Sequence, residues 1–401
     1  PLAEITAHPD SSTVLIAAVP RSLEEGDYTV RWRIVGDDGH PVAGEYGFQI
    51  ITPPQEDLPP GGSGASEPTP SEGDLRSSDS SSDLAQPEGD VGKNLPVGSL
   101  TYILVRWVNF AGILGVLGAV AFGLLVLPLA GLKVGRRVGS LTKSIPGKVG
   151  VISSAIVLLA AGARLISQRA AVFGTGAAMN LGQDSGALIS TPWGAGWVIQ
   201  ILAGAAALVG FRMVGSRPRT GWGLALLGAL SLSLTPALSG HAMSAEGTGL
   251  LPVLADTLHV IGAGGWIGSL FVLLLSAALS TSDEDSEDIR LFDLVGAFSP
   301  IALFFAAVLL VTGLFGAWIH LEGFSTLWTT DYGRVFLVKM AFLAPVFAIG
   351  AYNALRVRPA LGAGEGGTRF RWSAGIELGV ASLVLLVTSI LVATPEPLHG
   401  N

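Results

Sequence analysis

The sequence predicts a polytopic, mainly α-helical membrane protein that carries a partial all-β segment at its N-terminus. Of its 401 residues, 49% are hydrophobic and only 13% are charged, and the mean hydropathy is +0.56. The apolar residues concentrate after Leu100 in long runs. Each run has the roughly 20 apolar residues that a helix needs to cross a bilayer. Before residue 53, short alternating segments indicate β-strands instead.

Residues 1–52 read as short strands joined by polar turns. The predicted strands are STVLIAAV (from residue 12), YTVRWRIV (28–35) and EYGFQI (45–50), and the turns between them are EEGDY and GDDGHPVAG. Three or four strands are too few for a stable closed sandwich. We therefore expect this segment to be the C-terminal part of a larger, Ig-like β-sandwich.

Residues 53–98 form a linker. They are rich in Pro, Gly, Ser and acidic residues and contain very few large apolar ones. Such a segment cannot bury enough surface to offset the entropy lost on ordering, so we expect a disordered acidic tether. The acidic residues here and at 283–288 dominate the net charge of −8, which gives no indication of nucleic acid as a partner. The absence of cysteine excludes disulfides and thiolate metal sites.

Residues 99–395 contain eight apolar spans, and 396–401 form a short tail. The expected spans are 101–130, 149–172, 193–214, 221–239, 251–279, 296–320, 333–356 and 372–394. Lys and Arg concentrate in the first, third and seventh connections, whereas the second and fourth have none. This alternation predicts that odd-numbered connections are cytoplasmic and that both termini lie on the extracytoplasmic side. The acidic fifth connection, TSDEDSEDIR, departs from the pattern.

The stretch Leu238–Gly268 holds the strongest candidate site in the helical part. His241 and Met243 lie in its connection, and Asp256 and His259 lie at i and i+3 on one face of the next helix. Ionisable groups inside an apolar span are costly and suggest a site. Imidazole with carboxylate suits Cu(II) or Zn(II), and methionine tolerates Cu(I). Two alternatives remain open. Asp256 could orient the His259 ring without binding the metal itself, or the Asp–His pair could only hold neighbouring helices together.

A second candidate lies in the turn GDDGHPVAG. Asp38 and His40 are two residues apart, so on an extended strand both side chains point to the same face and can bind one metal. By spacing alone, an ordinary turn explains this segment better than a metal site does, because Asp-Gly is a common turn signal. His320, at the end of the sixth span, and Met179 are weaker additions to the ligands.

Other polar residues gather in the extracytoplasmic halves of the spans. They are Arg106, Asn109, Arg164, Gln168, Gln200 and Lys339. This bias predicts an outward-facing polar vestibule that narrows inward. We expect Arg164 and Lys339 to pair with Asp256 or with helix ends, and Glu377 to lie at the membrane interface.

The segment YTVRWRIVGDDGHPVAGEYGFQI resembles the end of the CopC-type periplasmic copper-binding domain, whose hallmark includes DGHPV. The resemblance implies that Asp38 and His40 are Cu(II) ligands. In that family a further histidine, near the mature N-terminus, completes the site. The segment that supplies it is absent from this chain.

Residues 99–395 resemble the CopD family of eight-span copper-resistance and copper-uptake proteins. The matching motifs are SGHA (239–242), ADTLHVIGAGGWIGSL (255–270), FSPIALFFAAVLLVTG (298–313) and YGRVFLVKMAFL (332–343). Ala297 stands where the family has an arginine. A CopC–CopD fusion joined by a linker has this order of parts.

These resemblances imply a copper importer, or a copper-handling protein, of the bacterial cytoplasmic membrane, and not an enzyme. The expected partners are copper ions, the lipid bilayer and periplasmic copper chaperones. Copper would pass by ligand exchange to His241, Met243, Asp256 and His259, with His320 as a further ligand. Two alternatives are a haem-binding electron carrier or cupric reductase that uses His259 with His241 or His320, and a copper sensor or assembly partner that transports nothing.

Overall fold

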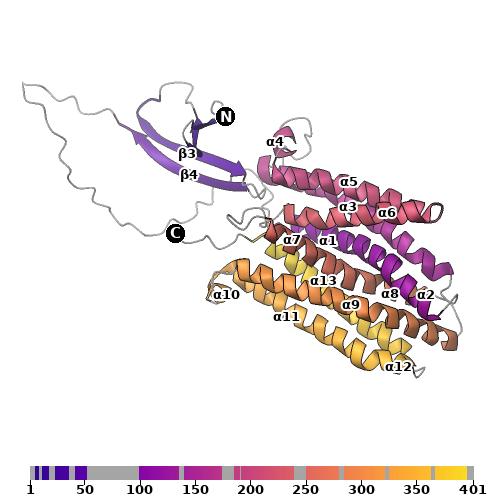
Figure 1. Ribbon diagram of the computed structural model, residues 1–401. Helices are drawn as coiled ribbons and strands as arrows, with labels where there is room; N and C mark the ends of the chain where they lie inside the picture. Colours follow the sequence, from indigo (N-terminus) through magenta and orange to yellow (C-terminus); the bar gives the residue numbers. More distant parts are fainter. Residues whose placement is uncertain are drawn as a thin grey trace, which may run out of the picture. The chain divides into compact units, whose positions relative to one another are not determined.

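A computed structural model describes residues 5–8, 11–17, 23–35, 41–51, 99–134, 140–173, 185–189, 191–238, 250–279, 284–320, 325–362 and 366–394. The chain divides into two compact units (Figure 1). The strand-containing unit comprises residues 1–34 and 42–90, and the helical unit comprises residues 35–41 and 91–401.

The strand-containing unit has four strands in two small sheets, which confirms the predicted β character. The strands are β1 (Ile5–His8), β2 (Ser11–Ala17), β3 (Gly26–Val35) and β4 (Pro41–Ile50). Strand β1 pairs antiparallel with β2, and β3 pairs with β4. Tyr28 of β3 stacks on Phe48 of β4, with ring centroids 5.6 Å apart. Such cross-strand aromatic pairs stabilise the pairing of two strands.

All eight predicted membrane spans are present as long apolar helices. Their bounds are Leu100–Gly131, Ser144–Val172, Trp193–Met213, Pro218–Leu238, Leu251–Ala278, Leu291–Ile319, Asp331–Leu361 and Gly367–Leu391. The last span begins earlier than the sequence indicated, because RFRW continues the helix although two of its residues are charged. Two short helices, α4 (Ser185–Ile189) and α10 (Thr326–Thr329), were not predicted.

Three of the spans are interrupted by a π-helical segment. Span 1 consists of α1 (Leu100–Ala121), the π segment Phe122–Val126 and α2 (Leu127–Val134). Span 5 consists of α7 (Leu251–Ala263), the π segment Gly264–Gly268 and α8 (Ser269–Ala278). Span 7 consists of α11 (Asp331–Tyr352), the π segment Asn353–Val357 and α12 (Arg358–Gly362). π segments of this kind frequently mark functional sites.

The other spans are single helices: α3 (Ser140–Phe173), α5 (Pro192–Met213), α6 (Pro218–Leu238), α9 (Glu284–His320) and α13 (Gly367–Leu391). Hydroxyl side chains define where three helices begin. Ser99, Thr191 and Thr330 cap α1, α5 and α11 by accepting from a backbone N–H three residues on. This satisfies a donor that the helix geometry leaves unpaired.

Helix α1 lies at the centre of the helical unit. It packs against α3, α6 and α13 and against the π segment of span 5. On one side, α3, α5 and α6 pack in sequence order, and on the other α7 packs on α9, and α11 on α13 (Figure 1). The spans therefore form two groups of neighbours, spans 1–4 and spans 5–8, that meet along α1 and where α6 packs on α7.

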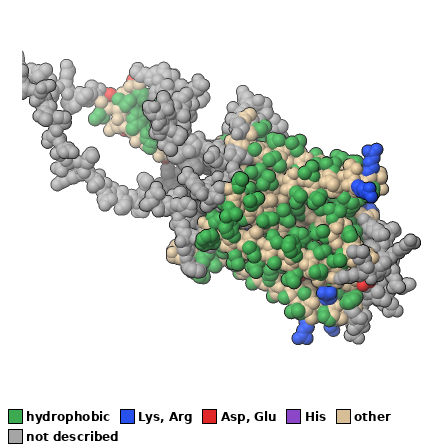
Figure 2. Space-filling model, in the orientation of Figure 1, with side chains coloured by type: hydrophobic (Ala, Val, Ile, Leu, Met, Phe, Trp, Pro, Cys, Tyr) green, Lys and Arg blue, Asp and Glu red, His purple; other side chains and the backbone are tan. Residues whose placement is uncertain are grey.

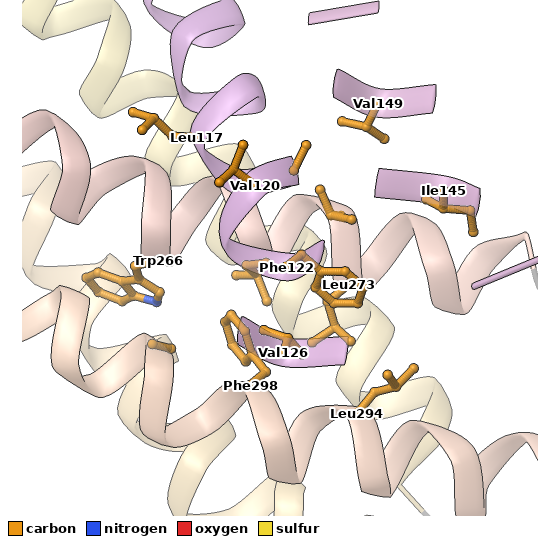
Figure 3. Close-up of a cluster of buried hydrophobic side chains, with 14 of the residues drawn as sticks. Leu117, Val120, Phe122, Val126, Ile145, Val149, Trp266, Leu273, Leu294 and Phe298 are labelled. Atoms are coloured by element: carbon orange, nitrogen blue, oxygen red, sulfur yellow. The ribbon is translucent and has the colours of Figure 1, made fainter. Parts of the chain in front are cut away.

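The contact between α1 and span 5 is a close approach of two backbones. A side chain at Gly118 would collide with the backbone of Gly268, and one at Gly268 would collide with the backbone of Leu114. Small residues allow such approach in membranes, where dispersion replaces the hydrophobic effect as the main source of packing energy. Beyond this crossing the core continues through large side chains (Figure 3). They include Phe122 and Val126 of span 1 and Leu273, Leu294 and Phe298 of spans 5 and 6.

The visible surface of the helical unit is covered by apolar side chains, and its Lys and Arg side chains gather at one end (Figure 2). Large apolar residues such as Leu159 and Leu303 are more than 70% exposed, as expected where lipid is the solvent. The cations at that end follow α5 and flank the junction of α12 with α13. They include Arg217, Arg219, Arg356 and Arg369.

We predict that Gly118→Ala destabilises the helical unit by about 2 kcal/mol or more, because its methyl group would overlap the Gly268 backbone. The matched control is Gly162→Ala on α3, where an added Cβ meets nothing within 4 Å. Thermal unfolding of the full chain in detergent checks this. Equal unfolding midpoints for the two variants would show that the crossing tolerates a side chain.

Candidate functional site

His259 lies on α7, and its imidazole is anchored on the neighbouring helix α9. Its Nδ1 is 3.1 Å from Oγ1 of Thr312. That hydroxyl donates to the carbonyl oxygen of Val308, 2.7 Å away, one helical turn earlier. Because the hydroxyl proton is used there, we assign Nδ1 as the donor to Thr312 Oγ1. Nε2 is then unprotonated and keeps its lone pair, and a neutral imidazole in this tautomer can bind a metal through Nε2.

Glycines bring the two helices close enough for this contact. A Cβ at Gly313 would lie 3.2 Å from Cε1 of His259, so the ring lies against the bare backbone of α9. A Cβ at Gly262 would lie 3.0 Å from the Phe305 carbonyl oxygen. Both positions favour glycine because a side chain would push α7 and α9 apart.

Asp256 and Lys339 accompany His259. Asp256 is one turn before it on α7, and the ammonium of Lys339, on α11, is near enough to both residues to act on them electrostatically. The predicted pairing of Lys339 with Asp256 is therefore supported. Arg164, in contrast, donates to Gln200 and lies over the Trp193 ring, so its predicted pairing with Asp256 or a helix end is wrong.

His259 lies about 12 Å inside its span. It is eight residues after Leu251, at a rise of about 1.5 Å per residue. Thr312 likewise precedes the end of α9, His320, by eight residues. His320 therefore stands about 12 Å along the bundle axis from the level of His259. The structure does not bring these two histidine positions together.

The other predicted ligands lie outside the described residues: Asp38, His40, Met179, His241 and Met243. The side chain of His320 also lies outside them. Within the described part of the chain, no three His, Asp or Glu residues gather around one point. Asp256 and His259 are thus the part of the predicted set whose surroundings are visible.

The polar residues of spans 1–3 do not line an open vestibule, and for these residues that prediction is wrong. The predicted residues of these spans are buried, and all except Arg106 form hydrogen bonds with other polar side chains of the same spans. Gln200 Nε2 donates to Asn109 Oδ1 at 2.7 Å, and Tyr102 Oη donates to Gln168 Oε1 at 2.5 Å. All four of these side chains are at most 2% exposed. A network of this kind satisfies polar groups that lipid cannot, and it ties α1, α3 and α5 together.

The environment of Glu377 differs from the one that the sequence predicted. The residue was expected at the interface, yet it is 2% exposed and lies ten residues inside α13. Its carboxylate accepts from Asn353 Nδ2 at 2.8 Å and from the Trp266 indole, and Ser373 donates to Asn353. Asn353 and Trp266 both belong to π segments. Trp266 also packs on Phe347 of α11, with ring centroids 4.9 Å apart.

The polar residues of spans 5–8 thus lie at successive depths along the axis of the helix bundle. His259 and Asp256 lie near one end, with Lys339 acting on both from α11. Trp266 is seven residues further along span 5 than His259, about 10 Å deeper, and it bonds to Glu377. This part of the bundle combines an imidazole, two carboxylates and an amide within membrane helices.

This fold and this site define a class: a polytopic helical membrane protein whose spans 5–8 hold costly ionisable groups. Three family matches make the identity more specific. Residues 2–51 match the CopC domain, residues 97–251 match "Copper resistance protein D-like, N-terminal domain", and residues 293–391 match "Copper resistance protein D". The chain is a CopC–CopD fusion.

Two curated relatives agree with this. The copper transport protein CutJ of Bacillus subtilis (strain 168) is 23% identical over 97% of this chain, which spans 64% of that relative's length. The inner membrane protein YebZ of Escherichia coli (strain K12) is 24% identical over 75% of this chain and 99% of its own length. No solved structure matches the chain significantly.

We predict that Asn353→Ala destabilises the protein by about 1–3 kcal/mol, because it leaves the buried Glu377 carboxylate and Ser373 hydroxyl without this partner. Ser389→Ala is the control, since the Ser389 hydroxyl is buried but bonds only to the Leu385 carbonyl of its own helix. Thermal unfolding of both variants in the same detergent tests the difference. A loss no larger than that of Ser389→Ala would mean that the Glu377 network contributes little.

Proposed function

We propose that this protein imports copper across the bacterial cytoplasmic membrane, with capture on the extracytoplasmic side and transfer into the helix bundle. Copper handling at the membrane agrees with its CopC and CopD family matches. The observation that carries the proposal is the His259 ring, held at Nδ1 by Thr312 with Nε2 left as a ligand, one turn from a carboxylate. The activity is transport by ligand exchange and involves no catalysed covalent step.

The proposed arrangement assigns residues 1–52 to a CopC-like domain, 53–98 to the linker, 99–395 to the CopD-like bundle and 396–401 to a tail. Asp38 and His40 would receive the metal, and His241 and Met243 would pass it on. The gathering of arginines at one end of the bundle supports placing that end in the cytoplasm and both termini outside (Figure 2).

Lys339 lies close enough to Asp256 for the two charges to attract each other. An unpaired carboxylate within a span is costly, and the nearby ammonium offsets that cost. An arriving copper ion would compete with Lys339 for Asp256. The site can therefore release its cargo again, because the ammonium is available to replace the metal.

Deeper in the bundle, Glu377 offers the next carboxyl group on an inward route. It lies about 10 Å beyond His259, beside Trp266 of the same span. Both π segments at this level place polar groups inside the bundle. Successive sites that bind without holding tightly are what conduction of an ion through a membrane requires.

The haem alternative that pairs His259 with His320 is less compatible with the geometry, whereas His241 lies outside the described residues. A bis-histidine haem needs two imidazoles on opposite sides of one iron. His320 stands about 12 Å along the axis from His259 and on another helix, which adds a lateral separation. A Soret band in the purified protein would revive this alternative.

Copper uptake by proteoliposomes containing the full chain tests the proposal. With a copper-binding dye inside, we expect the wild type to load the vesicles and His259→Ala to load them at least tenfold more slowly. His8→Ala, in β1 and outside every proposed site, serves as the control. Wild-type protein that binds copper but loads nothing would instead indicate a sensor or assembly partner. Equal loading by His259→Ala would refute the assigned site.

Thr312→Val tests the anchoring of the ring. Without the hydroxyl, His259 is still present, but nothing at this position fixes its tautomer or its ring orientation. We therefore expect the copper affinity to fall about 10- to 100-fold. Thr388→Val is the matched control, because the Thr388 hydroxyl bonds only to the Val384 carbonyl of its own helix. Competition with a chromophoric copper chelator gives both affinities. Identical values would leave Thr312 with a packing role only.

A further inference from the structure

Three arginines are buried in the first half of the bundle: Arg106, Arg164 and Arg169. Arg169 has an interaction partner, whereas Arg106 and Arg164 have no carboxylate partner among the described residues. Arg106 on α1 is 8% exposed and Arg164 on α3 is 7% exposed. Arg106 lies 4.2 Å above the Tyr102 ring, and Arg164 donates through Nη1 to the amide oxygen of Gln200. Within the described part of the chain, neither forms an ion pair. Buried guanidinium groups in a membrane span are expensive and usually pair or mark a site.

Arg106 and Arg164 each have a buried N–H group with no hydrogen-bond partner in the described part of the chain. These are Nη1 of Arg106 and Nε of Arg164. Roughly nine in ten buried donors in folded proteins bond to protein or water. Two unbonded donors on neighbouring cations are therefore unusual, and they indicate that an acceptor is missing. Guanidinium donors of this kind bind oxygen anions at short distance.

The two arginines belong to one cluster. The charge of Arg106 acts directly on Arg164. Gln200 links them as well, because it accepts from Arg164 and donates to Asn109, three residues after Arg106 on α1. Two like charges in a medium of low dielectric constant repel strongly. The surrounding groups are amide oxygens and aromatic faces, which attract a cation but do not neutralise it.

From these observations we infer that Arg106 and Arg164 form a binding site for a phosphate group between α1, α3 and α5. The planar guanidinium matches the geometry of a phosphate and binds it through parallel N–H donors. Arg106 lies six residues from Leu100, about 9 Å into the helix, which is within reach of the membrane boundary. The phosphate can come from two sources, an anionic lipid headgroup or inorganic phosphate in the aqueous phase.

This site is separate from the proposed copper route. Two uncompensated positive charges oppose a copper cation, and the cluster lies in spans 1–3, whereas His259 and Glu377 lie in spans 5 and 8. Failure of copper transport would therefore leave the phosphate site untouched, and the reverse also holds.

Binding to the full chain in maltoside micelles, which hold no phosphate group, tests the inference after exhaustive delipidation in phosphate-free buffer. One arm adds inorganic phosphate and the other adds phosphatidylglycerol. Native mass spectrometry counts bound molecules, and thermal unfolding reports stabilisation. We expect one of the two probes to bind at one molecule per chain and to raise the unfolding midpoint. The arm that does so identifies the source, and no binding in either arm would overturn the site.

The double variant Arg106→Gln with Arg164→Gln should weaken that binding at least tenfold. Arg217→Gln with Arg219→Gln is the control, because both arginines are exposed at the start of α6 and their substitution should leave binding unchanged. The double variant Arg106→Lys with Arg164→Lys keeps both charges and should retain part of the affinity. It therefore tests binding even if the glutamine variant does not fold. Undiminished binding in the glutamine variant would also overturn the assignment.

Discussion

The crossing of α1 over the π segment of span 5 is the contact on which the arrangement of the bundle depends. Gly118 and Gly268 let the two backbones meet without side chains between them. In lipid, close packing of this kind replaces the hydrophobic effect as the force that holds helices together. It joins the group of spans 1–4 to the group of spans 5–8, because α1 belongs to the first and contacts the second.

The same segment positions the polar groups of spans 5–8. On one side of the glycines, α7 carries Asp256 and His259 toward α9 and α11. Within the segment, Trp266 turns toward α13 and bonds to Glu377. A π turn adds a residue to the local helix and re-aims the side chains around it. The π segment of span 5 therefore affects both the position of His259 along the bundle axis and the contact between Trp266 and Glu377.

The sequence predicted the β character of the N-terminal segment and all eight spans, because long apolar runs have few alternatives to a membrane helix. It also identified Asp256 and His259, since their spacing places them on one helical face. It could not reveal Thr312 as the partner of His259, because that contact joins residues 53 positions apart. Glu377 was misplaced for a similar reason. The predicted span began at residue 372 and so placed Glu377 near its end, and only the tertiary contacts with Asn353 and Trp266 show a hydrogen-bonded carboxyl group.

The charges inside the bundle are segregated, and this has a consequence for the route of a cation. Spans 1–3 bury Arg106, Arg164 and Arg169, whereas spans 5–8 hold the His259 imidazole, the carboxyl groups of Asp256 and Glu377, and one lysine, Lys339. At low dielectric constant the first group raises the energy of a cation over a distance of many ångströms, while the second lowers it. A positively charged cargo would thus be directed to the spans that contain His259 and Glu377. A phosphate group bound at the arginines would weaken the repulsion from spans 1–3 without adding a competing ligand in spans 5–8.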